Sequence, residues 1–431
     1  MNVKKIISIS TVLALLLLGS PYPETVHGQT GGTNYVQNEV VVKLTNASDL
    51  PLIAAEYGLD AVPLGQIGNR PLYRLHIPDG VAVTRMVSLL QNDSLHRVVL
   101  AEPNFILSSP VGGSVPWSLG LSWSIGLSWS IGSSEKGYGR QWMKNRINLP
   151  AAHEISKGRN VKIAVLDTGI DLTHPIFAGR LLPGYDFVDN DNDPSEVGVP
   201  HQGAYGHGTH VAGIIAMVAP EAKIIPIRVM DQNGLCDVWR LMRALMFAAN
   251  PDGDINTNDG ADVINLSLGT PQRTTLLRQL IGAATNDGTG PDDPDFPQIG
   301  HPSIVIVAAA GNTGNETSIY PAAEHDILGL IAVGASTPSD TLADFSTRGD
   351  WVELMAPGEQ IVSSVPGGRF GVWRGTSMAA PIVSGIAALV RARYPNLKPN
   401  AIYEQIRQSA AVGKGTTIRR VDAARALTLA P

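Results

Sequence analysis

Five apolar stretches in the second part of the chain constrain its fold more than any other feature, because each stays apolar over several positions and ends in glycine or a polar residue. They occupy residues 160–169, 222–230, 261–269, 303–312 and 327–335. Helical patterns separate most of them, at His207–Val218, Val238–Ala249 and Thr274–Asn286. Strands that are apolar on both faces and alternate with helices form parallel sheets covered on both sides. The sequence therefore predicts an α/β fold, a doubly wound parallel sheet with helices on both faces, whose site lies beyond the carboxyl ends of its strands.

The composition is that of a globular protein and argues against nucleic acid as the main partner. Of the 431 residues, 44% are hydrophobic and 16% are charged, and the net charge is -6. Binding to phosphates needs a basic face, which this charge balance does not provide. The single cysteine, Cys236, allows no intrachain disulfide. Since no histidine adjoins it in the sequence, we interpret Cys236 as structural.

The N-terminus has the pattern of a secretory signal. Lys4 and Lys5 precede an apolar run over residues 6–18, which is too short for an ordinary membrane span but fits the hydrophobic region of a signal peptide. We predict a signal peptide over residues 1–28, cleaved after Gly28; an uncleaved N-terminal anchor is the alternative. We expect bacterial-type export, a secreted extracellular protein and no stable membrane insertion.

A small module is predicted upstream of the sheet, over residues 39–105. Strand-like stretches alternate there with two helical ones, and the second helical stretch has one apolar face. That face consists of Val83, Met86, Val87 and Leu90. The order β-α-β-α-β, with an extra hairpin strand, predicts a small α+β ferredoxin-like domain, which we assign to residues 29–108.

A hexapeptide repeat separates this module from the sheet. Trp117, Trp123 and Trp129 recur with a period of six among Ser, Gly and apolar residues. Three short copies are too few for a repeat domain. We therefore interpret residues 109–139 as a linker containing a Trp-Ser-x-Gly-x-Ser repeat, and residues 140–431 as the larger domain.

Candidate reactive side chains follow the predicted strands or begin the predicted helices. Asp167 ends the first strand, and Asn312 follows the fourth. His207 and His210 begin a helix at a spacing that places both on one face, so a zinc site is one alternative. Zinc peptidases of the H-E-x-x-H type, however, need another spacing and a glutamate base. We interpret His210 as a core histidine.

Ser377 begins the last long helix, in the segment GTSMAAPIVSGIAALV. A serine at this place could simply cap the helix. Thr376 could supply the cap instead, which would leave Ser377 available as a nucleophile near a helix terminus that favours negative charge. The segment is not the G-x-S-x-G turn of α/β-hydrolases.

Five motifs, in chain order, together resemble the subtilisin-like serine peptidases, or subtilases. They are VLDTGIDLTHP, GHGTHVAGI, VINLSLG, AAAGN and GTSMAAPIVSGIAALV. The resemblance spans about Gln141 to Leu427, and the Asp–His–Ser order is the one that subtilisin has. It implies that residues 140–431 form a subtilisin-like catalytic domain.

The resemblance implies a role for each candidate residue. Ser377 would be the nucleophile, His207 the general base, and Asp167 the carboxylate that orients the imidazole. The Asn312 side chain would donate to the oxyanion.

A substrate-binding set is implied in the same way: Ser267, Leu268, Gly269 and Ile319. The first three resemble the strand that pairs with the substrate backbone. Ile319 stands where the family has a residue at the base of the P1 pocket, and its branched side chain would favour small or medium apolar P1 residues.

The ferredoxin-like domain, which ends in AEPN, is similar to the propeptide of this family, an intramolecular inhibitor and folding chaperone. The resemblance therefore implies a secreted serine endopeptidase made as a zymogen. We expect protein or peptide substrates, a monomer, and no cofactor in the chemistry itself.

The sequence departs from subtilisins at their tight calcium site. Ile176 replaces an aspartate and no loop follows HVAG, so we expect that site to be absent. The segment YDFVDNDNDPSE instead resembles the calcium loop of the thermitase branch. Its candidate structural calcium ligands are Asp186, Asp189, Asp191 and Asp193. A solvated acidic loop without metal is the alternative.

Two other functions compete with the peptidase. A catalytically silent homologue would capture peptides, but the intact candidate triad argues against it. A sedolisin-type acid peptidase shares the GTS turn but has glutamate in place of the histidine, which the HGTH motif disfavours.

Overall fold

The computed structural model describes residues 33–67, 70–109, 135–199, 203–254, 257–285 and 304–429. Residues 35–431 form one compact unit. The predicted signal peptide and the tryptophan repeat lie outside the described residues. No described helix is both long and apolar enough to cross a bilayer.

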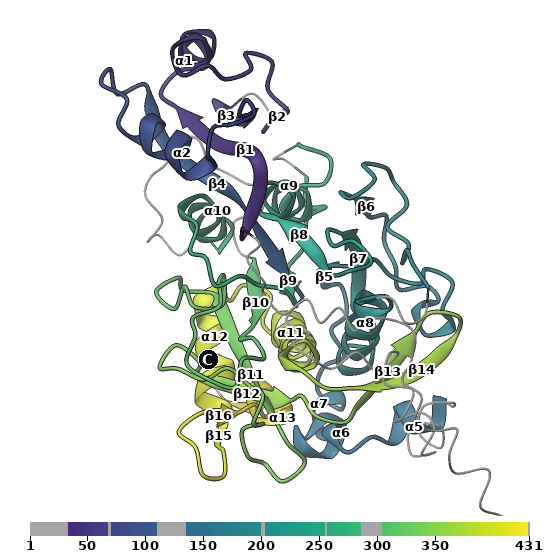
Figure 1. Ribbon diagram of the computed structural model, residues 1–431. Helices are drawn as coiled ribbons and strands as arrows, with labels where there is room; N and C mark the ends of the chain where they lie inside the picture. Colours follow the sequence, from purple (N-terminus) through teal and green to yellow (C-terminus); the bar gives the residue numbers. More distant parts are fainter. Residues whose placement is uncertain are drawn as a thin grey trace, which may run out of the picture. The chain divides into compact units, whose positions relative to one another are not determined.

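A nine-stranded sheet forms the centre of the larger domain, in the order β15-β16-β12-β11-β10-β9-β5-β7-β6 (Figure 1). The strands are β5 (Lys162–Asp167), β6 (Tyr185–Asp186), β7 (Lys223–Arg228), β9 (Val263–Leu266), β10 (Val305–Ala309), β11 (Leu330–Ser336), β12 (Leu354–Pro357), β15 (Ala411–Val412) and β16 (Arg419–Arg420). All neighbouring pairs are parallel except β15 with β16. The strand order reverses beside β5, where doubly wound sheets bind their ligands.

Alternate residues of β5 show that the sheet is buried on both faces. Ile163 and Val165 belong to one apolar core, with α8 (His207–Val218) and α11 (Thr376–Arg393). Ala164 and Leu166 belong to a second core, with α9 (Val238–Ala249) and α10 (Thr275–Thr285). The predicted parallel sheet between two helical layers is confirmed, and helices α8 and α9 have the predicted bounds.

The helices on the α11 side approach each other closely because their contact surface is built from small residues. A Cβ at Gly385 of α11 would come 2.6 Å from the Val218 Cβ of α8. The remaining helices of the larger domain are α5 (Glu135–Arg140), α6 (Met143–Arg146), α7 (Leu149–His153), α12 (Pro399–Ser409) and α13 (Ala423–Thr428). Strands β13 (Ile361–Val365) and β14 (Arg369–Trp373) form a separate antiparallel hairpin.

The small N-terminal domain is a β-α-β-α-β unit with one extra hairpin strand, as predicted. Its elements are β1 (Tyr35–Leu44), α1 (Leu50–Tyr57), β2 (Gly65–Gln66), β3 (Leu72–His76), α2 (Val83–Gln91) and β4 (Val98–Ser108). The sheet order is β2-β3-β1-β4-β8, in which β8 (Leu235–Asp237) comes from the larger domain. The predicted apolar face of α2 is buried.

Candidate active site

Asp167 is the last residue of β5, at the carboxyl edge of the central sheet. Its side chain is fully buried. Oδ1 accepts hydrogen bonds from the Thr168 backbone N–H at 2.8 Å and from His207 Nδ1 at 2.7 Å. Within the described parts of the chain, Oδ2 has no hydrogen-bond partner. A buried carboxylate bound to one imidazole nitrogen fixes the tautomer and the orientation of the ring.

His207 is the first residue of α8 and is buried. The helix can begin this close to β5 because Gly208 has no side chain; a Cβ there would come 2.1 Å from Gly169 O. With Nδ1 bound to Asp167, Nε2 is the nitrogen that can take up a proton. This nitrogen lies 3.3 Å from the Oγ of Ser109, the residue that follows β4.

Ser377 is the second residue of α11 and is 2% exposed. Its Oγ donates to Ser267 O at 3.5 Å, and Gly375, at the N-cap, has no side chain to cap the helix. In the chain as described, Ser377 Oγ and His207 Nε2 do not hydrogen-bond each other, since His207 contacts Ser109 instead. Hydrogen bonds between a nucleophile and its base are often long before substrate binds and tighten only in the reacting complex.

Asn312 follows β10 and is held in one orientation by the start of α11. Its Oδ1 accepts from the Thr376 backbone N–H at 2.9 Å and from the Thr376 hydroxyl at 3.0 Å. The Nδ2 atom lies on the side of Gly375, where a Cβ would approach it to 3.2 Å. The amide nitrogen is thus fixed beside the turn that carries Ser377.

The end of β4 lies between two segments of the larger domain. On one side it pairs with β8, with Ile106 opposite Asp237 and Ser108 opposite Leu235. On the other side, Ser108 and Gly269 exchange two backbone hydrogen bonds of 2.9 Å. The end of β4 therefore lies between β8 and Gly269 of the predicted substrate-binding segment.

Ile319 fills the space between two glycines, Gly269 and Gly311. A Cβ at Gly269 would come 2.5 Å from Ile319 Cγ2, and a Cβ at Gly311 would come 2.8 Å from Ile319 Cγ1. Its side chain is buried. Gly269 and Ile319 are thus brought together, and Leu268 is buried in the core of the α9 side.

Comparison with known families decides the identity of the fold. The family model of the subtilases matches residues 158–424, which is most of the larger domain. The chain belongs to the subtilase family. The model of the fervidolysin N-terminal prodomain matches residues 22–104, so the small domain of this subtilase is a prodomain. As a subtilase, the protein is a serine peptidase, a hydrolase of peptide bonds.

Individual subtilases are similar over most of the chain. Thermophilic serine proteinase of Bacillus sp. (strain AK1) is 33% identical over 376 residues, which cover 84% of this chain and 80% of that protein. Thermitase of Thermoactinomyces vulgaris is 36% identical over 261 residues, which cover 58% of this chain and 82% of that protein.

Among solved structures, fervidolysin from Fervidobacterium pennivorans has a TM-score of 0.70 at 23% identity, over 94% of this chain. The chain spans 62% of the length of fervidolysin, and the likeness shows the fold. A cold-adapted subtilisin-like serine proteinase has a TM-score of 0.51 at 30% identity, covering 62% of this chain and 90% of that one.

His210, the second histidine of the subtilase HGTH motif, lies in the core. Its ring stacks on Trp373 at 4.7 Å between centroids and 9° between planes, and Nε2 lies 3.3 Å from Gly371 O. Burial lowers the pKa of His210 to about 3, so the ring is neutral. Buried and stacked on Trp373, His210 has the environment of a core histidine.

The side chains of the four predicted calcium ligands do not point toward one common position. Arg228 Nη1 donates to Asp186 Oδ2 and to Asp189 Oδ2, both at 2.5 Å. Asp191 and Asp193 accept backbone N–H groups two residues further along the chain. In the described ranges no three His, Cys, Asp or Glu side chains are grouped to hold a metal ion. The guanidinium supplies the positive charge at Asp186 and Asp189, so the four carboxylates as arranged do not fit a calcium ion.

Arg228 and Glu196 were not among the residues predicted from the sequence. A signal for Arg228 was present, because a charged residue in an otherwise apolar buried strand needs a buried partner. Glu196 lies in the acidic segment, where nothing in the local sequence distinguishes it from its exposed neighbours.

Proposed function

We propose that the chain is exported as an inactive precursor and matures into a secreted serine endopeptidase with Asp167, His207 and Ser377 as its triad. The contact that carries the proposal is the end of β4, where Ser108 pairs with Gly269 and Ser109 contacts His207 Nε2. A chain paired in this way beside a carboxylate-bound imidazole has the position of a peptide substrate.

The chemistry follows from the hydrogen bond between Asp167 and His207 and from the hydroxyl of Ser377. Ser377 Oγ attacks the carbonyl carbon of the scissile peptide while His207 Nε2 accepts its proton. Asp167 holds Nδ1 and stabilises the imidazolium that forms. The imidazolium then protonates the leaving amine, and a water activated by His207 hydrolyses the acyl-enzyme.

The negative oxygen of the tetrahedral intermediate needs donors that are already in place. Asn312 Nδ2 is suited to this role, since the bonds from Thr376 to Oδ1 fix the orientation of the amide. The backbone N–H of Ser377, in the first turn of α11, is the second donor, and the helix terminus adds favourable partial charge.

The inhibitory prodomain would bind the catalytic domain through more than its strand β4. It also caps two helices of that domain. Glu102 accepts the N–H groups of Thr275 and Leu276, at 2.7 and 3.3 Å, where α10 begins. Asn104 accepts the N–H of Trp239 at 3.1 Å, where α9 begins. Each cap satisfies helix donors that would otherwise face water or remain unpaired.

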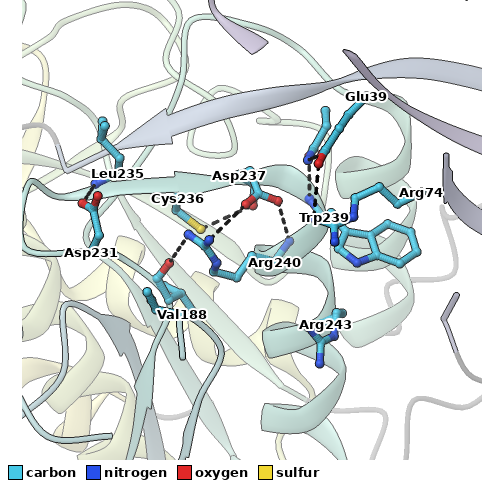
Figure 2. A network of polar contacts seen from close by, with 12 residues as sticks. Glu39, Arg74, Val188, Asp231, Leu235, Cys236, Asp237, Trp239, Arg240 and Arg243 are labelled. Atoms are coloured by element: carbon cyan, nitrogen blue, oxygen red, sulfur yellow. Dashed lines mark hydrogen bonds and ion pairs between the residues drawn. The ribbon is translucent and has the colours of Figure 1, made fainter. Parts of the chain in front are cut away.

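Figure 2 shows the contact at α9, with Glu39 and Arg74 of the prodomain beside Trp239. Glu39 accepts from Asn104 Nδ2 at 2.8 Å and pairs with Arg74 at 3.7 Å. In the same view Asp237 caps α9 by accepting from the Arg240 N–H at 3.0 Å, beside the buried Cys236. Burial raises the pKa of the Cys236 thiol, in keeping with a structural residue.

Export, the domain boundaries and a monomeric state complete the proposal. The prodomain match begins at residue 22, within the predicted signal peptide of residues 1–28. Sequencing the N-terminus of secreted precursor determines that boundary directly. Sedimentation of the mature enzyme measures its oligomeric state.

A fluorophosphonate probe tests the proposed activity. We expect mature enzyme to be labelled at Ser377, because only a serine activated by a neighbouring base reacts with such probes. Absence of labelling in mature protein whose prodomain has been removed would favour the silent, peptide-capturing homologue.

Ile319 should set the P1 preference of the enzyme. Replacing it in Ile319→Gly opens the space between Gly269 and Gly311. One methylene more or less in an apolar pocket changes the discrimination between two substrates about 10- to 200-fold. We therefore expect the ratio of kcat/KM for P1 Phe to that for P1 Ala to rise about 100-fold. A P1 peptide library measures the ratio, with Ile319→Val as the control that keeps the branch. Strong selection of P1 Arg or Lys by the wild type would contradict this assignment.

A further inference from the structure

A short segment before the catalytic histidine is fixed against the turn that carries Asp167. The Ile170 N–H donates to Pro194 O at 3.0 Å, and the Glu196 N–H donates to Ile170 O at 3.2 Å. Gly169, with a φ of +108°, lies so close to this segment that a Cβ would come 2.6 Å from Ser195 O. The backbone of Glu196 is therefore held at a defined position beside the Asp167 turn.

From this position the Glu196 side chain reaches the first turn of α8. Its Oε2 accepts from the Thr209 N–H at 3.2 Å and from the Thr209 hydroxyl at 2.8 Å. The Thr209 hydroxyl oxygen in turn accepts the Asp171 N–H at 2.9 Å. One carboxylate thus connects the strand turn after Asp167 with the helix turn that begins at His207.

The carboxylate is in an unusual electrostatic position. Oε1 is closed off from solvent and, among the described residues, makes no hydrogen bond of normal geometry. Burial, with the nearby Asp167 charge in the same direction, raises the pKa of Glu196 to about 7, although Thr168, Gly206 and Thr209 act against it. Among the described residues, Tyr205 is a further titratable group close to this carboxylate, and Asp171 and Arg369 also influence it.

We propose that Glu196 is a positioning residue, whose carboxylate braces the Asp167 turn against the His207 turn and keeps the two catalytic groups in register. It touches no reacting atom. The proposal rests on the proposed triad of Asp167, His207 and Ser377.

The ionised Glu196 carboxylate does not stabilise the fold, which argues that it has a role other than stability. Because its pKa is raised from 4.5 to about 7 by folding, the folded state holds the extra proton between these values. The free energy of unfolding therefore falls as pH rises through this window. A neutral Glu196→Gln variant, which keeps the shape and one acceptor, should be at least as stable as the wild type at alkaline pH.

The test compares Glu196→Gln with the wild type in kcat, KM and thermal unfolding from about pH 5 to about pH 10. At alkaline pH we expect kcat to fall about tenfold, because a charge-assisted hydrogen bond is replaced by a neutral one, with little change in KM or melting temperature. The acid limb of kcat/KM should lose the ionisation of Glu196, since a glutamine at this position does not titrate. Active-site titration with a fluorophosphonate corrects for unprocessed enzyme.

Two further variants separate positioning from packing. Glu196→Asp keeps the negative charge. It should therefore keep the ionisation of this carboxylate in the acid limb of kcat/KM, even where kcat falls. Thr209→Val removes a donor to the carboxylate and should move the acid limb to higher pH in the wild type but not in Glu196→Gln. The exposed Glu154→Gln is the control for a change of net charge.

An unchanged kcat and an unchanged acid limb in Glu196→Gln would overturn the proposal, as would a loss of kcat that only follows a loss of melting temperature. Failure of the wild type itself to label or to cleave peptides would instead overturn the proposed function.

Discussion

Ser377→Ala should abolish peptidase activity and leave the precursor at full prodomain length. The variant loses only the Oγ atom, which donates to Ser267 O, so the fold and the docked strand β4 should remain. Loss of the nucleophile costs about 10⁶ in kcat in subtilisin, and the same order is expected here. Gel mobility, intact mass and hydrolysis of a peptide substrate measure the two effects. Ser339→Ala, an exposed serine outside the site, is the control and should mature normally.

Comparing the N-termini of the wild type and of Ser377→Ala also locates the first cut during maturation. Ser109 directly follows β4, with its N–H donating to Gly234 O at 2.9 Å and its Oγ beside His207. We therefore expect the first cut at or shortly after Ser109, with the first new N-terminus within a few residues of it. The linker of residues 109–139 would then remain on the enzyme after the first cut. A first N-terminus beyond residue 134 would contradict this, as would processing of Ser377→Ala in the absence of added protease.

Much of this fold follows from local patterns. The strands are apolar at consecutive positions because both faces of the sheet are covered, as Ile163 and Ala164 show by lying in opposite cores. Helix bounds follow from where the apolar period begins and ends, and α8 begins at His207 as expected. The motif order then predicts which strand and helix ends meet, because parallel strands share one carboxyl edge.

What the sequence does not show are contacts between side chains that are distant in the chain and depend on packing. Arg228 and Asp189 are 39 positions apart, and their ion pair could not be read from the acidic loop alone. Glu196 looks like one more surface acid until its backbone is fixed beside Gly169. The contact of Ser109 with His207 depends on docking of the whole prodomain, which no local pattern encodes.

Asn312→Asp should lower kcat sharply while leaving the first turn of α11 intact. Aspartate keeps the acceptor oxygen that binds the Thr376 N–H and hydroxyl, but it replaces the Nδ2 donor with a negative oxygen. Loss of the corresponding donor in subtilisin costs about 10²–10³ in kcat, and the added repulsion of an oxyanion should make the loss here at least that large. KM should change little, because the donor acts on charge that develops in the transition state.

The design separates the donor from the acceptor of the same amide. Asn312→Ala removes both and should cost kcat and also melting temperature, since Thr376 loses its partner. Asn315→Asp, in the same loop, is the matched control: Asn315 Oδ1 accepts from the Thr317 N–H at 2.9 Å, and an aspartate keeps that bond. If Asn312→Asp retains kcat within about threefold, less than 1 kcal/mol of transition-state stabilisation comes from Nδ2. The oxyanion would then depend on the Ser377 N–H and the α11 terminus alone, and Asn312 would serve only to anchor Thr376.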